Sequence, residues 1–313
     1  MELVIPEPHE AHAGLRAIKT VLTCEAPLNP IETKLLEAAQ THILRYQANL
    51  ETLATIAPAE LAEAVVRPEV RAQLVRGMVI GSFASGDANE TQLELIGHFA
   101  TALGVEPPAL EELRRLVHKQ LAALRFDVLR KMYIGKAIGS FWDDEGFRGI
   151  MKVIGSFRGW REDAELAAKY QAMGQLPAGT LGREFYEHCR RHEFPLPGER
   201  FCGPELMVRH DMAHVLGGYG SDPEGEMQVA AFTAGFRREQ SMHILLFVLC
   251  QFDLGIQMVP VAAPEFGNLD ADLFLRALAR GARMNLDLFD WDYWAVIDQP
   301  VTELRERYGI TAA

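Results

Sequence analysis

The sequence has few of the features that mark secreted proteins. It contains only four cysteines, which are widely spaced and form no C-x-x-C pair: Cys24, Cys189, Cys202 and Cys250. Cysteines scattered in this way are typical of free thiols in a reducing compartment, and they exclude a dense disulfide framework. We therefore expect a cytoplasmic protein with free thiols.

The sequence also lacks an excess of positive charge. Its 43 acidic residues outnumber its 31 lysines and arginines, and the formal net charge is −12. Nucleic-acid-binding domains usually present a basic face, so this balance argues against a nucleic-acid partner. It argues equally against adhesion to anionic lipid through overall charge.

Neither a signal peptide nor a membrane span is evident. The N-terminal stretch MELVIPEPHEAHAG has acid and proline where a signal peptide needs a basic start and an apolar run. The most apolar segment, residues 242–264, is interrupted by Gln251, Asp253 and Gln257, and its uninterrupted part is too short for a bilayer. We expect a soluble protein, and the sequence leaves open a peripheral contact with the inner face of a membrane.

Patterns typical of β-strands are scarce, whereas helix signals are frequent. Asn29-Pro30-Ile31-Glu32 combines a cap, proline at the first helical position and glutamate at the third. Pro58 and Pro68 are expected to begin two further helices. Asp87 is expected to cap another helix, which Gly104 ends. With 49% apolar residues available for a core, the sequence predicts an all-α fold.

Helical periodicity also predicts the longer elements and a domain boundary. Residues 31–53 form one periodic run, and residues 108–131 predict a long amphipathic helix that begins at Pro108. A segment rich in glycine and aromatic residues, at about 135–160, differs from its helical flanks. We predict two helical domains, comprising residues 1–135 and 136–313.

The segment FASGDANETQLELIGHFATALGV, residues 83–105, resembles the acidic loop and following helix of TerB-like (tellurite-resistance protein B) domains. Asp87 and Glu90 stand where that family often has acidic residues. We interpret them as a helix cap and a first-turn acid that interacts with the helix dipole, and not as metal ligands. The TerB-like bundle is expected to dock a partner or to form a homodimer.

In the second predicted domain, helices are expected near residues 162–173 and 181–192, and a third is expected to begin at Pro204. This third helix contains His210, Asp211 and His214, whose spacing places all three side chains on one face. The glycine-rich break 217–220 follows. Ser221 or Asp222 is then expected to cap a helix that starts at Pro223.

A tight turn between these two helices would direct Glu226 back toward the first helix. Imidazole and carboxylate groups that converge in this way suit a first-row divalent ion. The alternative interpretation is helix capping and hydrogen bonding in the core, with Glu226 favourable near a helix N-terminus. We predict that His210, Asp211, His214 and Glu226 bind a divalent metal.

Other residues near this motif have simpler interpretations. His188 and His192 in HCRRH have the same spacing as the predicted ligands, but the arginines between them are typical of a solvated helix tail. Arg209 is expected to pair with Glu205, four residues earlier on the same helix. The apolar residues that follow Glu226 are expected to form ordinary core, with a groove for an isoprenoid chain as the alternative.

H-D-x-x-H, followed by eleven residues and then E, is the motif of the coenzyme Q biosynthesis protein 4 family, which the chain resembles. The motif reads His210-Asp211-x-x-His214 and Glu226, with no departure. LPAGTLGREFYEHCRRH, residues 176–192, and GARMNLDLFDWDYWAVIDQPVTELRERYGI, residues 281–310, look like the upstream and C-terminal segments of that family. The similarity covers about 175–313, and the N-terminal bundle is not part of the usual family architecture.

This resemblance implies an all-α domain whose motif residues bind a metal, usually zinc. It also implies a role in ubiquinone biosynthesis, namely loss of the ring carboxyl of a polyprenylated benzoate with hydroxylation at that carbon. Because zinc has no redox chemistry, an oxidative step favours iron, manganese or cobalt, or a substrate that itself reacts with oxygen. Other quinone-biosynthesis proteins are the expected partners, and the sequence identifies no catalytic residue apart from the ligands.

Two further functions remain as alternatives. One is a prenyl-lipid-binding scaffold of a quinone-biosynthesis complex, in which the metal is structural. The other is metal-dependent hydrolysis by analogy with H-E-x-x-H sites, where the glutamate acts as general base. We rank hydrolysis last because Asp211, at the second position, is one methylene shorter and is better interpreted as a ligand.

Overall fold

The computed structural model describes residues 2–86, 88–106, 109–131, 162–202, 207–237, 239–259 and 263–311. Over these residues the protein contains 14 α-helices and no β-strand, which confirms the predicted all-α fold. Two predictions concern residues outside the described ones: the boundary at 135–160 and the helix start at Pro204. The predicted cap at Asp87 is wrong, because the Asn89 side chain accepts a hydrogen bond from the Gln92 N–H and caps α5. The helix predicted to start at Pro108 begins at Leu110.

The described helices fall before and after residues 132–161. The first set comprises α1 (Pro8–Leu22), α2 (Pro30–Ala38), the π-helix η1 (Ala39–Leu44), α3 (Pro58–Ala64), α4 (Pro68–Ala84), α5 (Glu90–Leu103), α6 (Leu110–Val117) and α7 (Leu121–Lys131). The second set comprises α10 (Ala164–Gln171), η2 (Ala172–Gln175), α11 (Leu181–Arg191), α12 (Val208–Gly217), α13 (Pro223–Phe236), α14 (Ser241–Phe252), α15 (Ala271–Ala282), η4 (Leu288–Asp290), η5 (Tyr293–Val296) and α16 (Val301–Tyr308). None of these helices has the length and apolar character needed to cross a membrane.

Most predicted helix ends are found where the sequence placed them. The Asn29 side chain accepts a hydrogen bond from the Glu32 N–H, and Glu32 accepts one from the Asn29 N–H, so the capping box is confirmed. Pro58 and Pro68 stand at the starts of α3 and α4. Gly104 ends α5 in the left-handed conformation, at φ 64°.

Two long helices predicted from periodicity are wrong. The run 31–53 is helical only as far as Leu44, through α2 and η1, and Arg45 ends it in the left-handed conformation. The run 108–131 is divided into α6 and α7. The chain folds back between them, which allows Arg115 on α6 to pair with Asp127 on α7. Apolar spacing fits a bent pair of helices as well as a straight one, so it could not locate the reversal.

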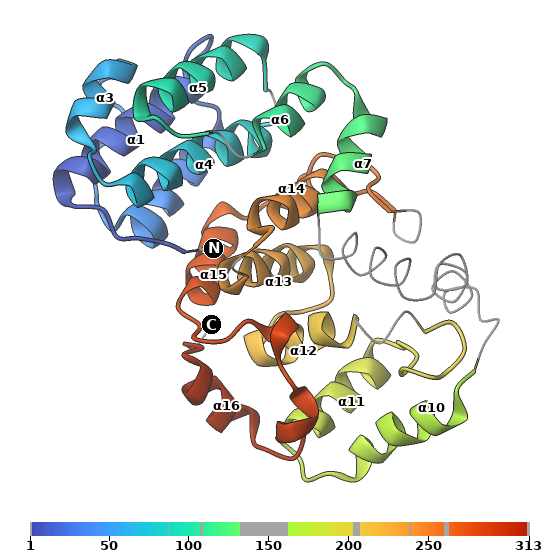
Figure 1. Ribbon diagram of the computed structural model, residues 1–313. Helices are drawn as coiled ribbons and strands as arrows, with labels where there is room; N and C mark the ends of the chain where they lie inside the picture. The colour runs from blue at the N-terminus through green and yellow to red at the C-terminus, as the bar shows by residue number, and fades with distance from the viewer. Residues whose placement is uncertain are drawn as a thin grey trace.

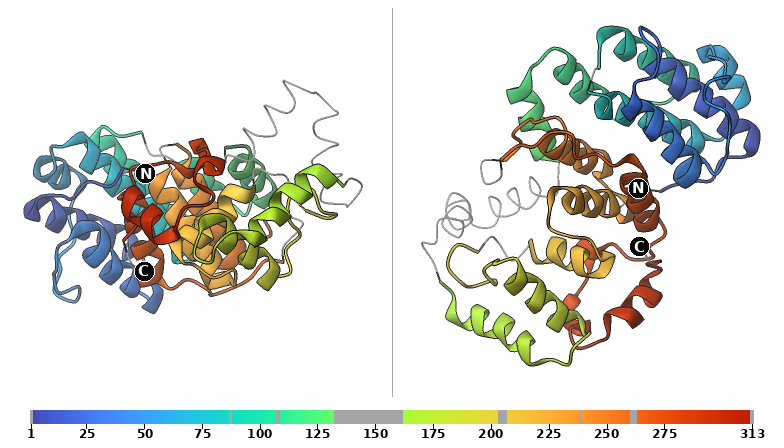
Figure 2. Two further views of the ribbon diagram at one scale, coloured as in Figure 1. Left: turned by 90° about the horizontal axis from the view of Figure 1, so that it is seen from below. Right: turned by 180° about the vertical axis from the view of Figure 1, so that it is seen from behind.

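The helices lie in three groups (Figure 1). Helices α1–α6 form one group, α13–α15 lie in the middle, and α10–α12 with α16 lie on the other side; the view from behind shows the same order (Figure 2). Helix α15 packs against α2 and η1, and α14 packs against α4 and α7. The described buried side chains of all three groups belong to one connected apolar core. The middle group therefore joins the N-terminal helices to α12, and its helix α13 carries Glu226 of the predicted metal motif.

Helices α13 and α15 approach each other closely because glycine stands on both sides of the contact. A Cβ on Gly281 would collide with the Phe232 carbonyl oxygen, and a Cβ on Gly235 would collide with the Leu278 carbonyl oxygen. Only glycine permits such an approach of two backbones. Phe232 and Phe236 beside this contact are buried, as are most of the apolar residues of α14, which confirms that they form core.

A buried acidic group joins α6, α7 and α14. The Glu112 side chain is 1% exposed, and its Oε1 lies 2.5 Å from Lys131 Nζ and 3.3 Å from His243 Nε2. Burial raises the pKa of Glu112, but the hydrogen bonds from His243 and Lys131 outweigh it and lower the pKa to about 2. The ionised carboxylate therefore stabilises the attachment of α14 to the N-terminal helices.

Replacing the glycine at the α13–α15 contact is expected to destabilise the protein. Gly281→Ala forces the two backbones apart. The free energy of unfolding, measured in urea, should therefore fall by about 1–3 kcal/mol or more. Gly97→Ala is the matched control, because Gly97 lies within α5 and a Cβ there would meet nothing within 4 Å. The free energy of unfolding of this control should rise by about 0.5–1 kcal/mol, because alanine is favoured over glycine inside a helix. Equal effects of the two substitutions would contradict the close contact.

The Glu112 group predicts a specific dependence of stability on pH. A carboxyl whose pKa is lowered on folding contributes stability above its unfolded pKa and loses it as the pH falls through the folded pKa. Wild-type protein should therefore lose this contribution between about pH 4.5 and pH 2. Glu112→Gln should be about 2 kcal/mol less stable at pH 7 and should lose less stability on acidification. Glu94→Gln, an exposed acid on α5, is the control and should behave like wild type.

Candidate metal centre

The turn between α12 and α13 brings the predicted ligands together. Helix α12 ends at Gly217, and Gly218 follows in the left-handed conformation at φ 77°. The Asp222 side chain then accepts a hydrogen bond of 2.7 Å from the Gly225 N–H and caps α13, which begins at Pro223. Of the two predicted caps, Ser221 and Asp222, the second is therefore found. Glu226 lies in the first turn of α13.

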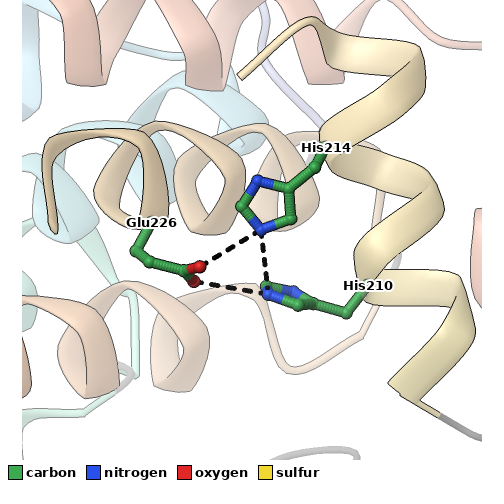
Figure 3. Close-up of side chains that lie close together, drawn as sticks. All are labelled: His210, His214 and Glu226. Atoms are coloured by element: carbon green, nitrogen blue, oxygen red, sulfur yellow. Dashed lines mark hydrogen bonds and ion pairs between the residues drawn. The ribbon is translucent and has the colours of Figure 1, made fainter. Parts of the chain in front are cut away.

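His210, His214 and Glu226 form a compact group (Figure 3). The two Nε2 atoms are 3.2 Å apart. Glu226 Oε2 lies 3.3 Å from His210 Nε2, and Glu226 Oε1 lies 3.3 Å from His214 Nε2. The donor atoms of the three side chains all lie within 4.8 Å of one another, and the described residues contain no other such group of three.

The group is anchored on one side and partly open on the other. The His214 side chain is 1% exposed, whereas those of His210 and Glu226 are 21% and 25% exposed. Within the described part of the chain, His214 Nδ1 is buried and has no hydrogen-bond partner, so the polar contacts of this ring lie at Nε2. The site therefore has a fixed imidazole and an edge that small molecules can reach.

Burial and pairing compete in setting the ionisation of these groups. Burial raises the pKa of Glu226, but hydrogen bonds and charge interactions with His210 and His214 outweigh it and hold the pKa of Glu226 well below its usual range. Burial lowers the pKa of His210, but the interactions with Glu226 outweigh it and the pKa is raised. Without a metal, the arrangement therefore favours an ion pair between His210 and Glu226.

The donor atoms of this group suit a divalent metal. Zinc is bound at about 2.0–2.1 Å by histidine nitrogen, so two ligands of a tetrahedral ion lie about 3.3 Å apart. The observed separations of 3.2 and 3.3 Å match this spacing. Two histidines with one carboxylate also form the donor set of non-haem iron(II) sites. The three residues present therefore fit either ion.

Asp211 is not a member of the group of three. Burial raises the pKa of its carboxyl to about 6, against the opposing charges of His210 and His214. The geometry therefore unites three of the four predicted ligands and leaves Asp211 beside them.

His188 is a neighbour of the site that sequence reasoning missed. Its ring stacks on that of His214 with centroids 5.4 Å apart, and the residue is only 7% exposed, so the expected solvated helix tail is wrong at this position. Burial, together with the charges of His214 and His192, lowers the pKa of His188 to about 4. The spacing of HCRRH showed that the two histidines share a face but not that His188 faces α12.

Two further side chains near the motif are oriented by the structure. Arg209 lies over the ring of Tyr293, at 5.6 Å from its centroid, and its expected partner Glu205 is outside the described residues. Tyr219, in the glycine-rich turn, is buried and its hydroxyl accepts a hydrogen bond from Arg280. Arg280 also donates to the Gly217 carbonyl, so this pair fixes the turn.

No protein-family model matches the chain, and a search of curated proteins also gives no match. The resemblances to the coenzyme Q biosynthesis protein 4 family and to TerB-like domains therefore stay predictions. They rest on the residues quoted for them.

Removing the carboxylate of the group should change the titration of its histidine. In metal-free protein, Glu226→Gln takes away the partner that raises the pKa of His210 and leaves burial, which lowers it. NMR titration of the imidazole Cε1–H signals should therefore show a lower pKa for His210. Glu224→Gln removes an exposed carboxylate two residues away and should leave this pKa as in wild type. The same pKa in all three proteins would contradict the pairing.

Proposed function

We propose that the protein is a metal-dependent enzyme of ubiquinone or prenylquinone biosynthesis. Its substrate is a polyprenylated benzoate, whose ring carboxyl leaves as carbon dioxide and is replaced by a hydroxyl from water, while dioxygen takes up the two electrons and becomes hydrogen peroxide. The observation that carries the proposal is the convergence of His210, His214 and Glu226 at ligand spacing. The resemblance of the surrounding segments to the coenzyme Q biosynthesis protein 4 family supplies the substrate.

The three side chains of the group would hold the metal through two nitrogens and a carboxylate. A bound divalent ion of this donor set supplies Lewis-acid stabilisation of a phenolate and, for iron, chemistry with dioxygen. Glu226 offsets part of the ion's charge. The buried ring of His214 holds its Nε2 in a fixed direction, which keeps the donor geometry constant.

The position of Asp211 supports an enzyme over a scaffold. A structural metal site normally has four protein ligands, whereas a catalytic site keeps a position for water or substrate. Here three donors converge, Asp211 lies outside the group, and the side chains of His210 and Glu226 are partly exposed. These features favour an ion with an accessible position.

A prenylated substrate would bring the protein to a membrane surface. The proposal therefore includes a cytoplasmic location with peripheral contact at the inner face of the membrane, and association with other quinone-biosynthesis proteins. No helix of the described residues crosses a membrane, so such a contact would be made by the surface of the folded protein.

Metal content and turnover test the proposal together. Wild-type protein should contain nearly one equivalent of iron, manganese, cobalt or zinc by mass spectrometry, and His210→Ala and Glu226→Gln should lose at least ten-fold in occupancy. Glu224→Gln is the matched control and should keep the metal. Under air, metal-loaded wild type should convert a prenylated 4-hydroxybenzoate with release of carbon dioxide, and the two ligand variants should not.

Two outcomes would contradict parts of this account. Wild-type protein that binds no metal after each ion is added back would exclude a metal enzyme. Stoichiometric metal, lost in both ligand variants but without turnover of prenylated benzoates under air, would favour the prenyl-lipid-binding scaffold with a structural metal.

A further inference from the structure

A cavity of about 500 Å³ lies between α11, the α12–α13 turn and the start of α16. These elements lie next to one another at the end of the molecule away from the N-terminal helices (Figure 1). His214 lines the cavity, whereas neither His210 nor Glu226 does. The cavity is therefore a second space beside the candidate metal centre and not its mouth.

The charged side chains that line this cavity are mostly cationic. Arg191 and Arg305 face it from α11 and α16, and Glu184 is the one carboxylate among the described lining residues. Glu184 already accepts a hydrogen bond of 3.0 Å from the Gly179 N–H. The chain as a whole has a net charge of −12, so a concentration of guanidinium groups around one cavity runs against its overall balance.

The two arginines are only partly engaged by hydrogen bonds within the protein. Arg305 donates from Nε and Nη2 to the carbonyl oxygens of Leu216 and Val215 at the end of α12, at 2.8 and 3.1 Å. Its Nη1 has no acceptor in the described part of the chain. Arg191 is exposed and lacks an ion pair or hydrogen bond with any described residue. A cation near a helix C-terminus stabilises the helix, which accounts for Arg305 at the end of α12. It does not account for a cavity lined by two arginines.

Two further hydrogen-bonding side chains complete the lining. The Thr302 hydroxyl and the imidazole of His192 face the same space from α16 and α11. A tetrahedral oxyanion accepts hydrogen bonds from several directions, and guanidinium groups bind it through charge-assisted hydrogen bonds. Two arginines also match the charge of a phosphate dianion better than that of a single carboxylate.

We propose that this cavity binds a ligand through a phosphate group, with Arg191 and Arg305 as its principal cationic contacts. The inference does not require a metal at His210, His214 and Glu226, and it adds a second binding site on the other side of His214. A phosphate ester or free phosphate would be recognised by the same groups.

Isothermal titration calorimetry of the full chain in metal-free buffer tests this site. Inorganic phosphate and phenyl phosphate are the probes, and benzoate tests for a carboxylate. Wild type should bind both phosphate probes, and Arg191→Gln should weaken binding about ten-fold or more, because a charge-assisted contact is lost. Arg200→Gln removes an exposed arginine that does not line the cavity and should bind like wild type. Tighter binding of phenyl phosphate than of inorganic phosphate would assign the site to an ester.

Separate results would overturn the proposal. Absence of binding by both phosphate probes would do so, as would equal weakening by Arg191→Gln and Arg200→Gln. Binding of benzoate without binding of phosphate would show a carboxylate site instead. Glu226→Gln should retain phosphate binding, and its loss there would move the anion to the candidate metal centre.

Discussion

The close contact between α13 and α15 is the constraint on which the rest of the structure depends. Gly235 and Gly281 allow the two backbones to meet, because a Cβ at either position would collide with a carbonyl oxygen or another backbone atom of the facing helix. Helix α15 packs in turn on α2 and η1, and His42 of η1 pairs with Asp272 of α15 at 2.6 Å. Helix α13 is therefore fixed to the N-terminal helices through α15, and its first turn is held where Glu226 meets α12.

Once α13 is fixed, the candidate metal centre follows from a short turn and two ring positions. The turn at Gly218 reverses the chain, Arg280 holds it through the Gly217 carbonyl and the Tyr219 hydroxyl, and Asp222 caps the next helix. The His214 side chain is buried, and its Nε2 lies 3.3 Å from Glu226 Oε1 and 3.2 Å from His210 Nε2. The same histidine separates this group from the cationic cavity beside α11 and α16. Binding at either site would therefore act on a residue that both share.

The sequence predicted local features well and long-range placement poorly. The all-α fold, the capping box at Asn29, and the turn that returns Glu226 to α12 all depend on residues close in sequence, whose geometry is set by backbone preferences. The ends of the runs 31–53 and 108–131 depend on tertiary packing, which apolar periodicity does not contain. The burial of His188 against His214 also joins helices that a loop separates, so spacing alone could not reveal it. For the same reason, helical spacing placed Asp211 near its neighbours without showing that it lies outside their group.

The central claim of this account is that His210, His214 and Glu226 bind one divalent ion. The most direct test is anomalous diffraction from crystals of metal-loaded protein, recorded on both sides of the absorption edge of the metal. One strong anomalous peak is expected about 2.0–2.2 Å from both Nε2 atoms and from a carboxylate oxygen of Glu226. A peak at other residues would contradict binding by these three side chains. So would the absence of a peak in crystals in which His210, His214 and Glu226 keep the separations of the metal-free protein.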